Sequence, residues 1–116
     1  GASASSQVSG CTNGNPTDDV WYKFTANSEG AIVTLSSVVG TSTDMYFAVY
    51  GGTCASLGTP LICSDPNSNT VPSITLGQTY YVRVYTYSTT QNSTTFNICA
   101  YAGYSLRHIL ESSFEI

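Results

Sequence analysis

The chain has 116 residues, enough for one domain with a single buried core. Only 9% of the residues are charged, against about 25% in ordinary soluble proteins, and the formal net charge of −4 argues against nucleic acid and against an anionic membrane surface. Ser, Thr, Asn, Gly and Tyr supply the polarity instead, which predicts a secreted or cell-surface β-domain.

Residues 1–17 have little apolar content, and we interpret them as a flexible lead-in. From 18 onward, strand-like segments rich in β-branched and aromatic residues recur about every ten residues, with Gly, Pro, Asn and Asp between them. The predicted strands are 18–26, 31–37, 45–50, 61–63, 70–76, 77–87 and 95–102. This spacing predicts an all-β domain over 18–104, an antiparallel, jelly-roll-like β-sandwich of about seven to nine strands.

The C-terminal stretch "SLRHILESSFEI" (105–116) has a different composition. Leu106, Ile109, Leu110 and Phe114 fall at helical spacing. The stretch also contains the only histidine, His108. It is interpreted as a linker, as the start of a neighbouring domain, or as a tail added to the domain.

Four cysteines allow three disulfide pairings. Their spacing does not fit a zinc site, which needs close C-x2-4-C pairs. Eight residues separate Cys54 from Cys63, and both have turn-like neighbours, so a local bridge is plausible. That bridge would leave Cys11 to pair with Cys99 and tie the lead-in to the last strand. An even number of cysteines in a chain with so little charge favours an oxidising, extracellular compartment.

Enzymatic activity has little support in the residues. The single histidine lies in the atypical C-terminal stretch, and no G-x-S-x-G elbow is present. A glycosidase would need two paired carboxylates. The candidates, Asp18, Asp19, Asp44 and Asp65, occupy strand edges and turns, where aspartate commonly caps backbone groups. We therefore expect a domain that is not an enzyme and requires no cofactor.

Calcium is a better use for two of these carboxylates, because Ca²⁺ takes oxygen ligands from carboxylates and backbone carbonyls in loops. Asp44 precedes the third predicted strand, and Asp65 begins the turn "DPNSN". If a calcium site exists, Asp44 and Asp65 are its predicted ligands, together with loop carbonyls. The competing interpretation is that both residues only cap turns.

The segment "GQTYYVRVYTY" (77–87) contains four tyrosines. In a strand, successive side chains point to opposite faces. One face would carry Tyr80, Val82, Val84 and Thr86, and the other Tyr81, Arg83, Tyr85 and Tyr87. The first set is typical of a core. We call the second set the tyrosine face and predict it as a ligand-binding surface, because tyrosine combines a broad apolar ring with a polar tip. Two alternatives remain open: part of this face is buried, or its tyrosines only form cross-strand pairs.

Five segments, "DVWYKFTA", "TDMYFAVYGGTC", "LICSD", "LGQTYYVRVYTY" and "TFNICAY", occur in that order within residues 11–102. In order and in cysteine placement they resemble the bacterial pre-peptidase C-terminal domains, particularly the cysteine-bearing type of secreted Bacteroidetes proteins. The resemblance implies a jelly-roll sandwich that serves as a non-catalytic module on a secreted protease or hydrolase. It also relates the chain to the collagen-binding domains of clostridial collagenases, some of which bind calcium.

The residues and the resemblance together predict a monomeric accessory module beside a parent catalytic domain. The module would hold its parent enzyme to an insoluble extracellular polymer, either a collagen-like protein or a polysaccharide, through the tyrosine face. The alternative is a structural spacer or processing domain without a strong ligand.

Overall fold

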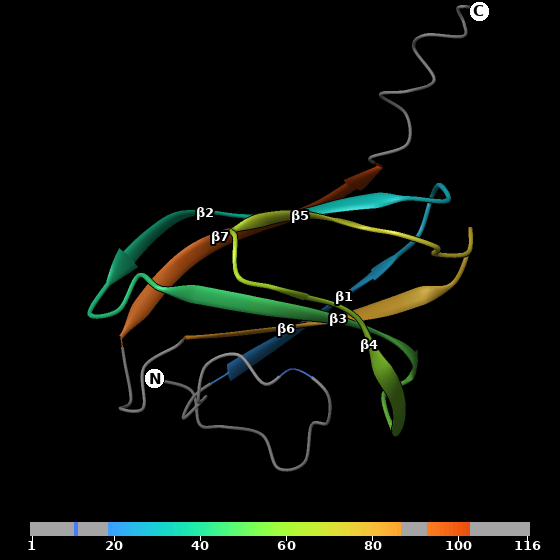
Figure 1. Cartoon of the computed structure of the whole chain (residues 1–116), viewed down its shortest axis with the longest axis horizontal. Helices are drawn as coiled ribbons and strands as arrows, with labels where there is room; N and C mark the ends of the chain where they lie inside the picture. Colours follow the sequence, from blue (N-terminus) through green and yellow to red (C-terminus); the bar gives the residue numbers. More distant parts are fainter. Residues whose placement is uncertain (1–10, 12–18, 87–92, 103–116) are drawn as a thin grey trace, which may run out of the picture.

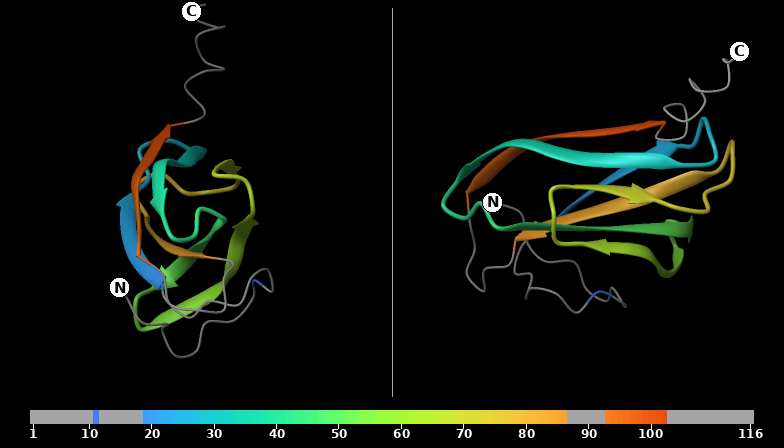
Figure 2. Two further views of the ribbon diagram at one scale, coloured as in Figure 1. Left: turned by 90° about the vertical axis from the view of Figure 1, so that its left-hand side faces the viewer. Right: turned by 45° about the horizontal axis from the view of Figure 1, so that its top comes forward.

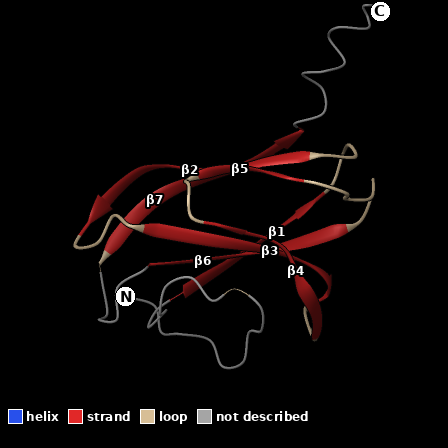
Figure 3. Cartoon of the chain, viewed as in Figure 1, coloured by secondary structure: helices blue, strands red, loops and turns tan. Residues whose placement is uncertain are grey.

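A computed structural model describes residue 11 and residues 19–86 and 93–102. Seven strands form two antiparallel sheets in this part of the chain, and it contains no helix (Figures 1 and 3). The strands are β1 (Asp19–Thr25), β2 (Ala31–Gly40), β3 (Met45–Thr53), β4 (Ser56–Ser64), β5 (Ser68–Val71), β6 (Thr79–Thr86) and β7 (Thr94–Ala102). The predicted all-β sandwich is confirmed.

The larger sheet has four strands in the order β1-β6-β3-β4, and the smaller sheet has three in the order β5-β2-β7. The two sheets lie face to face as two layers, with β5, β2 and β7 forming the upper layer in Figure 1, and the right-hand view of Figure 2 shows β2 and β7 side by side along the top. In the four-stranded sheet β6 lies between β1 and β3, although 53 residues separate the end of β1 from the start of β6.

The core fills the space between the layers, and alternate residues of the strands supply it. The most deeply buried side chains include Val33 of β2, Phe47 and Val49 of β3, and Val82 and Val84 of β6. The predicted inward face of β6 is therefore confirmed. At one side of the sandwich, the rings of Tyr22 and Phe96 meet edge to face at 6.1 Å and join β1 to β7 across the layers.

Two segments differ from the sequence-based prediction. Residues 51–60 were predicted as a loop, but most of them extend β3 and β4 into a long hairpin. Its register shifts on both sides of Tyr50, so bulges accommodate residues that would not fit a regular ladder. Conversely, the strand predicted over 70–76 ends at Val71. Pro72 follows immediately and cannot donate a ladder hydrogen bond.

Several predictions fall outside the described residues. These are the lead-in except for Cys11, the carboxylate candidate Asp18, the helical pattern and histidine of 105–116, and Tyr87. The domain boundaries at 17 and 104 therefore stay predictions. No helix that is long and apolar enough to span a membrane occurs in the described part of the chain.

Candidate functional site: the outer face of the four-stranded sheet

The outer face of the four-stranded sheet, which points away from the three-stranded sheet, carries the tryptophan, four tyrosines and both basic residues of the described part of the chain. The register of β1, β6 and β3 arranges its side chains in three rows across the strands. The rows are Asp19–Tyr85–Tyr46, Trp21–Arg83–Ala48 and Lys23–Tyr81–Tyr50. Tyr81, Arg83 and Tyr85 thus share one face, as alternation along the strand predicted.

Arg83 occupies the central row and forms a buried ion pair. Its Nε donates a hydrogen bond to Oδ2 of Asp19 at 2.5 Å, and the two side chains are only 8% and 1% exposed. The guanidinium also lies over the ring of Tyr85, with Cζ 5.0 Å from the ring centroid. Asp19 neutralises the charge of Arg83, which a buried guanidinium requires. Asp19 was considered above as a catalytic acid, and the structure shows it paired with Arg83 instead.

Aromatic rings pack around this ion pair. The rings of Tyr46 and Tyr85, neighbours on adjacent strands, have centroids 5.7 Å apart. Trp21 and Tyr50 have centroids 5.6 Å apart, although their strands β1 and β3 are two strand spacings, about 9.6 Å, from each other. Their rings therefore lean toward each other across β6.

Burial sets the protonation of two of these phenols. Desolvation raises the pKa of Tyr50 above the ordinary value of 10.0, while the charge of Arg83 and a hydrogen bond from it act in the opposite direction. Desolvation likewise raises the pKa of Tyr85, again with an opposing effect from Arg83. Both side chains are therefore neutral hydroxyl groups at physiological pH.

Exposure divides the outer face into a closed part and an accessible part. Tyr46 and Tyr85 are buried together with Arg83. In contrast, Lys23 is exposed, and Trp21 and Tyr81 are partly exposed. We call Trp21, Lys23 and Tyr81 the platform. Of the predicted ligand-binding residues, only Tyr81 belongs to it, and Tyr87 lies outside the described residues.

The ligand-binding role of the tyrosine face stays a prediction. Tyr46 and Tyr50 were not predicted for this face, because they come from β3 and join it only through the register with β6. Trp21 and Lys23 reach the face because they alternate with Val20, Tyr22 and Phe24 along β1, and neither was predicted as a ligand-binding residue. The sequence did offer one signal for Lys23, because a positive charge directly after Trp21 and Tyr22 is typical of a binding surface.

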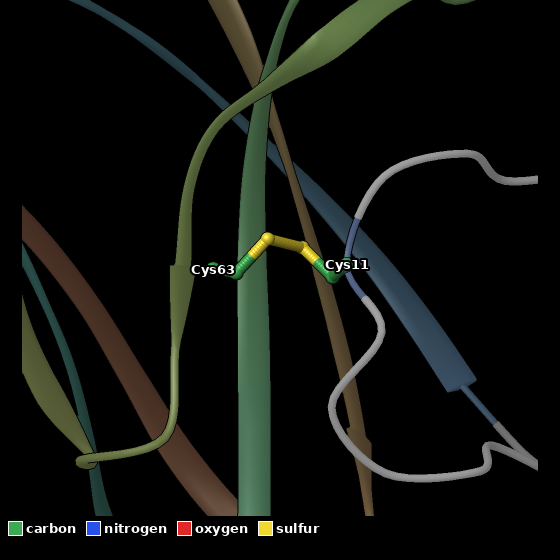
Figure 4. The surroundings of a disulfide bond; sticks show 2 residues. All are labelled: Cys11 and Cys63. Carbon is green, nitrogen blue, oxygen red and sulfur yellow. A yellow bond between two sulfur atoms is a disulfide. The ribbon is translucent and has the colours of Figure 1, made fainter.

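The disulfide prediction is wrong in its pairing. Cys11 bonds to Cys63 (Figure 4). Cys54 and Cys99 are free and exposed. Cys54 lies at the tip of the β3–β4 hairpin, next to the Thr53–Ser56 pair. Cys63 pairs with Ala48, which lies five positions from Thr53, away from the tip. Five strand residues span about 16 Å, far beyond the Cα separation that a disulfide tolerates.

Cys99 is equally unsuited to bond Cys11. It lies on β7 in the three-stranded sheet and alternates with the inward-packed Ile98, so its side chain points away from the sandwich. Cys63 points outward from the four-stranded sheet, next to Ala48 on the outer face. The disulfide therefore fixes Cys11 beside that face, at the β4 side.

The predicted calcium ligands lie at one end of the four-stranded sheet. Asp44 directly precedes β3 and Asp65 directly follows β4, and both are exposed. Near Asp65 the turn is organised by local hydrogen bonds: Ser64 Oγ donates to the carbonyl of Pro66 at 2.7 Å, and Asn69 Nδ2 donates to Ser64 Oγ at 3.3 Å. No group of three or more His, Cys, Asp or Glu side chains suited to a metal occurs among residues 11, 19–86 and 93–102. Calcium binding stays a prediction.

Comparison with known proteins identifies one family. The family model described as "Galactose binding domain-like", which is associated with T9SS, matches residues 1–98 and so covers most of the chain. No curated protein and no solved structure matches the chain significantly. A T9SS-associated domain implies a secreted or cell-surface protein of Bacteroidetes, and the Cys11–Cys63 disulfide fits that location. The match agrees with the secreted Bacteroidetes β-domain expected from the sequence, while the relation to pre-peptidase C-terminal domains and to collagenase domains stays a prediction.

Proposed function

The chain belongs to the galactose binding domain-like family associated with T9SS, and on that premise we propose that it is a non-catalytic accessory module that binds an extracellular polysaccharide. By binding the polysaccharide, the module would hold its parent secreted protein, such as a hydrolase or protease, near the substrate of that protein. The platform is the proposed contact surface. The observation that carries the proposal is the clustering of Trp21 and Tyr81, both partly exposed, on one sheet face.

Partly exposed aromatic side chains at this position suit a sugar ligand. The flat ring of Trp or Tyr can lie against the C–H face of a sugar ring, while a phenol or indole edge remains available for hydrogen bonds. Thr25 and Thr79 lie in the next row of the same face and face each other with their hydroxyl oxygens 3.4 Å apart. Hydroxyl groups beside aromatic rings give a surface that can exchange hydrogen bonds with sugar hydroxyls.

A structural spacer is the second candidate, and the closed part of the outer face favours it. Arg83 and Tyr85 are too deeply buried to touch a ligand without rearrangement. Their contacts therefore act on the stability of the sheet. A spacer would keep these contacts and have no use for the platform.

Co-sedimentation and affinity electrophoresis test the proposal. The 116-residue chain would be assayed against soluble and insoluble galactans, glucans, chitin and uronic-acid polymers, and against fibrillar collagen, each with calcium or EDTA. We expect binding to at least one polysaccharide, and a loss of about fivefold or more in Trp21→Ala and Tyr81→Ala, which is the order of magnitude of one aromatic contact.

Tyr101→Ala is the matched control, because Tyr101 is an aromatic residue of the three-stranded sheet and is 46% exposed. Circular dichroism would establish that each variant folds. Binding that Tyr101→Ala weakens as much as Tyr81→Ala would place the contact elsewhere. Binding to collagen alone would transfer the role to a protein ligand, and binding to no polymer would leave the spacer as the function.

A further inference from the structure

We infer that the sugar bound at the platform carries a carboxylate, so that the ligand is a polymer containing uronic acid. The inference deepens the proposed function and rests on it. It follows from the distribution of charge in the chain, from the state of each basic residue, and from the position of Lys23 beside the aromatic rings.

Basic residues are scarce, and their location is uneven. The chain contains three Lys and Arg residues against seven Asp and Glu. Two of the three, Lys23 and Arg83, lie on the outer face of the four-stranded sheet, and Arg107 lies outside the described residues. The strands of this sheet contain one acidic residue, Asp19. The sheet therefore has a net charge of +1 in a chain whose net charge is −4.

The two cations of the outer face are in different states. Arg83 is buried and its charge is compensated by Asp19, so it is not available to a ligand. Lys23 is exposed and forms no ion pair with a described residue. The other described acidic residues, Glu29, Asp44 and Asp65, lie in the connections between strands rather than on this face. Lys23 is thus the accessible positive charge of the sheet.

Lys23 is placed where a bound sugar would present its substituents. It pairs directly with Tyr81 across the β1–β6 ladder, and Trp21 is two positions away on the same face of β1. Directly opposed side chains have Cβ atoms about 5 Å apart, and residues two positions apart on a strand are about 6.6 Å apart. A sugar ring stacked on Tyr81 or Trp21 would therefore have its edge within reach of the Lys23 ammonium group.

Charge complementarity selects the substituent at that edge. A neutral sugar would leave the ammonium group solvated and would gain little from it. The carboxylate of a uronic acid would form an ion pair with it, and the hydrogen bond would be charge-assisted. Because the chain as a whole repels anions, preference for an acidic polymer would have to arise locally, at Lys23.

Polygalacturonate and its methyl ester form a suitable pair of probes, because they share the same sugar and differ in the charge of the carboxyl group. Binding of the full chain would be measured to both in calcium-free buffer, at low and at moderate salt. We expect polygalacturonate to bind about threefold more tightly per site, the size of one exposed ion pair, and we expect salt to reduce this preference. Lys23→Gln should abolish the preference, and Lys23→Arg should retain it.

The outcomes separate this inference from the proposed function. Equal binding of both polymers, or a preference that survives in Lys23→Gln, overturns the acidic ligand while leaving polysaccharide binding intact. In that case Lys23 only protects β1, an edge strand, from pairing with other chains. If the chain binds neither these polymers nor any neutral polysaccharide, both the inference and the proposed function fail. A Lys23→Gln variant could also lose binding to both polymers while keeping a normal circular dichroism spectrum. That result would show that the Lys23 charge is required for binding as a whole, and it would also support the inference.

Discussion

The Cys11–Cys63 disulfide gives the sharpest prediction about stability. It joins residues 52 positions apart in the sequence. In the chain-entropy model, closing a loop of this length restricts the unfolded chain enough to stabilise the fold by about 4 kcal/mol at 25 °C. A domain of this size has a free energy of unfolding of about 5–15 kcal/mol, so the loss would be a large fraction of the total. Cys63→Ser should therefore leave a marginally stable domain.

Urea denaturation measures this loss, and the single tryptophan, Trp21, reports on the same sheet. Cys11→Ser and Cys63→Ser should be destabilised equally, and the double variant no further than either single one, because all three remove the same bond. Cys54→Ser and Cys99→Ser are matched controls and should stay within about 0.5 kcal/mol of the parent, since both residues are exposed and free.

A different pattern would refute the reasoning. If Cys54→Ser lost as much stability as Cys63→Ser, and Cys99→Ser as much as Cys11→Ser, the bonds would be those first expected from the sequence. A loss well below 1 kcal/mol in Cys63→Ser, with the bond detected by mass spectrometry in the parent, would instead show that the entropic account does not apply to this loop.

Three further predictions concern burial and backbone. Asp19→Ala leaves the buried Arg83 without its anion and should cost about 3–5 kcal/mol in urea denaturation; a loss below 1 kcal/mol would contradict the buried ion pair. Burial raises the pKa of Tyr50 above 10.0, so its contribution to stability is complete below pH 10 and decreases as the pH rises through the raised value, because the unfolded chain ionises first. Tyr50→Phe should reduce the alkaline loss of stability measured between pH 8 and 11, and an unchanged profile would argue against that burial. Gly40→Ala should be destabilising by at least about 1 kcal/mol, because Gly40 has a φ of 149° and a Cβ there would lie 2.2 Å from a backbone carbonyl oxygen; Gly58→Ala, where nothing lies within 4 Å, is the control whose equal loss would refute this explanation.

Alternation along single strands was predictable from the sequence. In β6 the inward residues Val82 and Val84 and the outward residues Tyr81 and Tyr85 were assigned correctly, because a period of two is a local property of the backbone. The fold class followed from the number and spacing of such segments.

Relations between distant strands were not predictable in the same way. The burial of Arg83 depends on Asp19, which is 64 positions away in the sequence, and on the aromatic residues of β3. Nothing local in "YVRVY" distinguishes an arginine that binds a ligand from one that pairs with a neighbouring strand. The cysteine pairing failed for a related reason. The loop predicted between Cys54 and Cys63 is largely strand, which separates the two residues instead of bringing them together.

The closed and accessible parts of the outer face are complementary rather than competing. Trp21 leans across β6 onto Tyr50, which is itself held among buried neighbours, so the ring is positioned before any ligand arrives. A surface that is already ordered loses less conformational entropy on binding. The buried Arg83–Asp19 pair would then contribute to affinity without touching the ligand, by keeping β1 and β6 in register beneath the platform. On this argument a conservative change such as Asp19→Asn, which preserves a hydrogen-bond acceptor, should weaken polysaccharide binding less than Trp21→Ala does, even where it lowers the free energy of unfolding more.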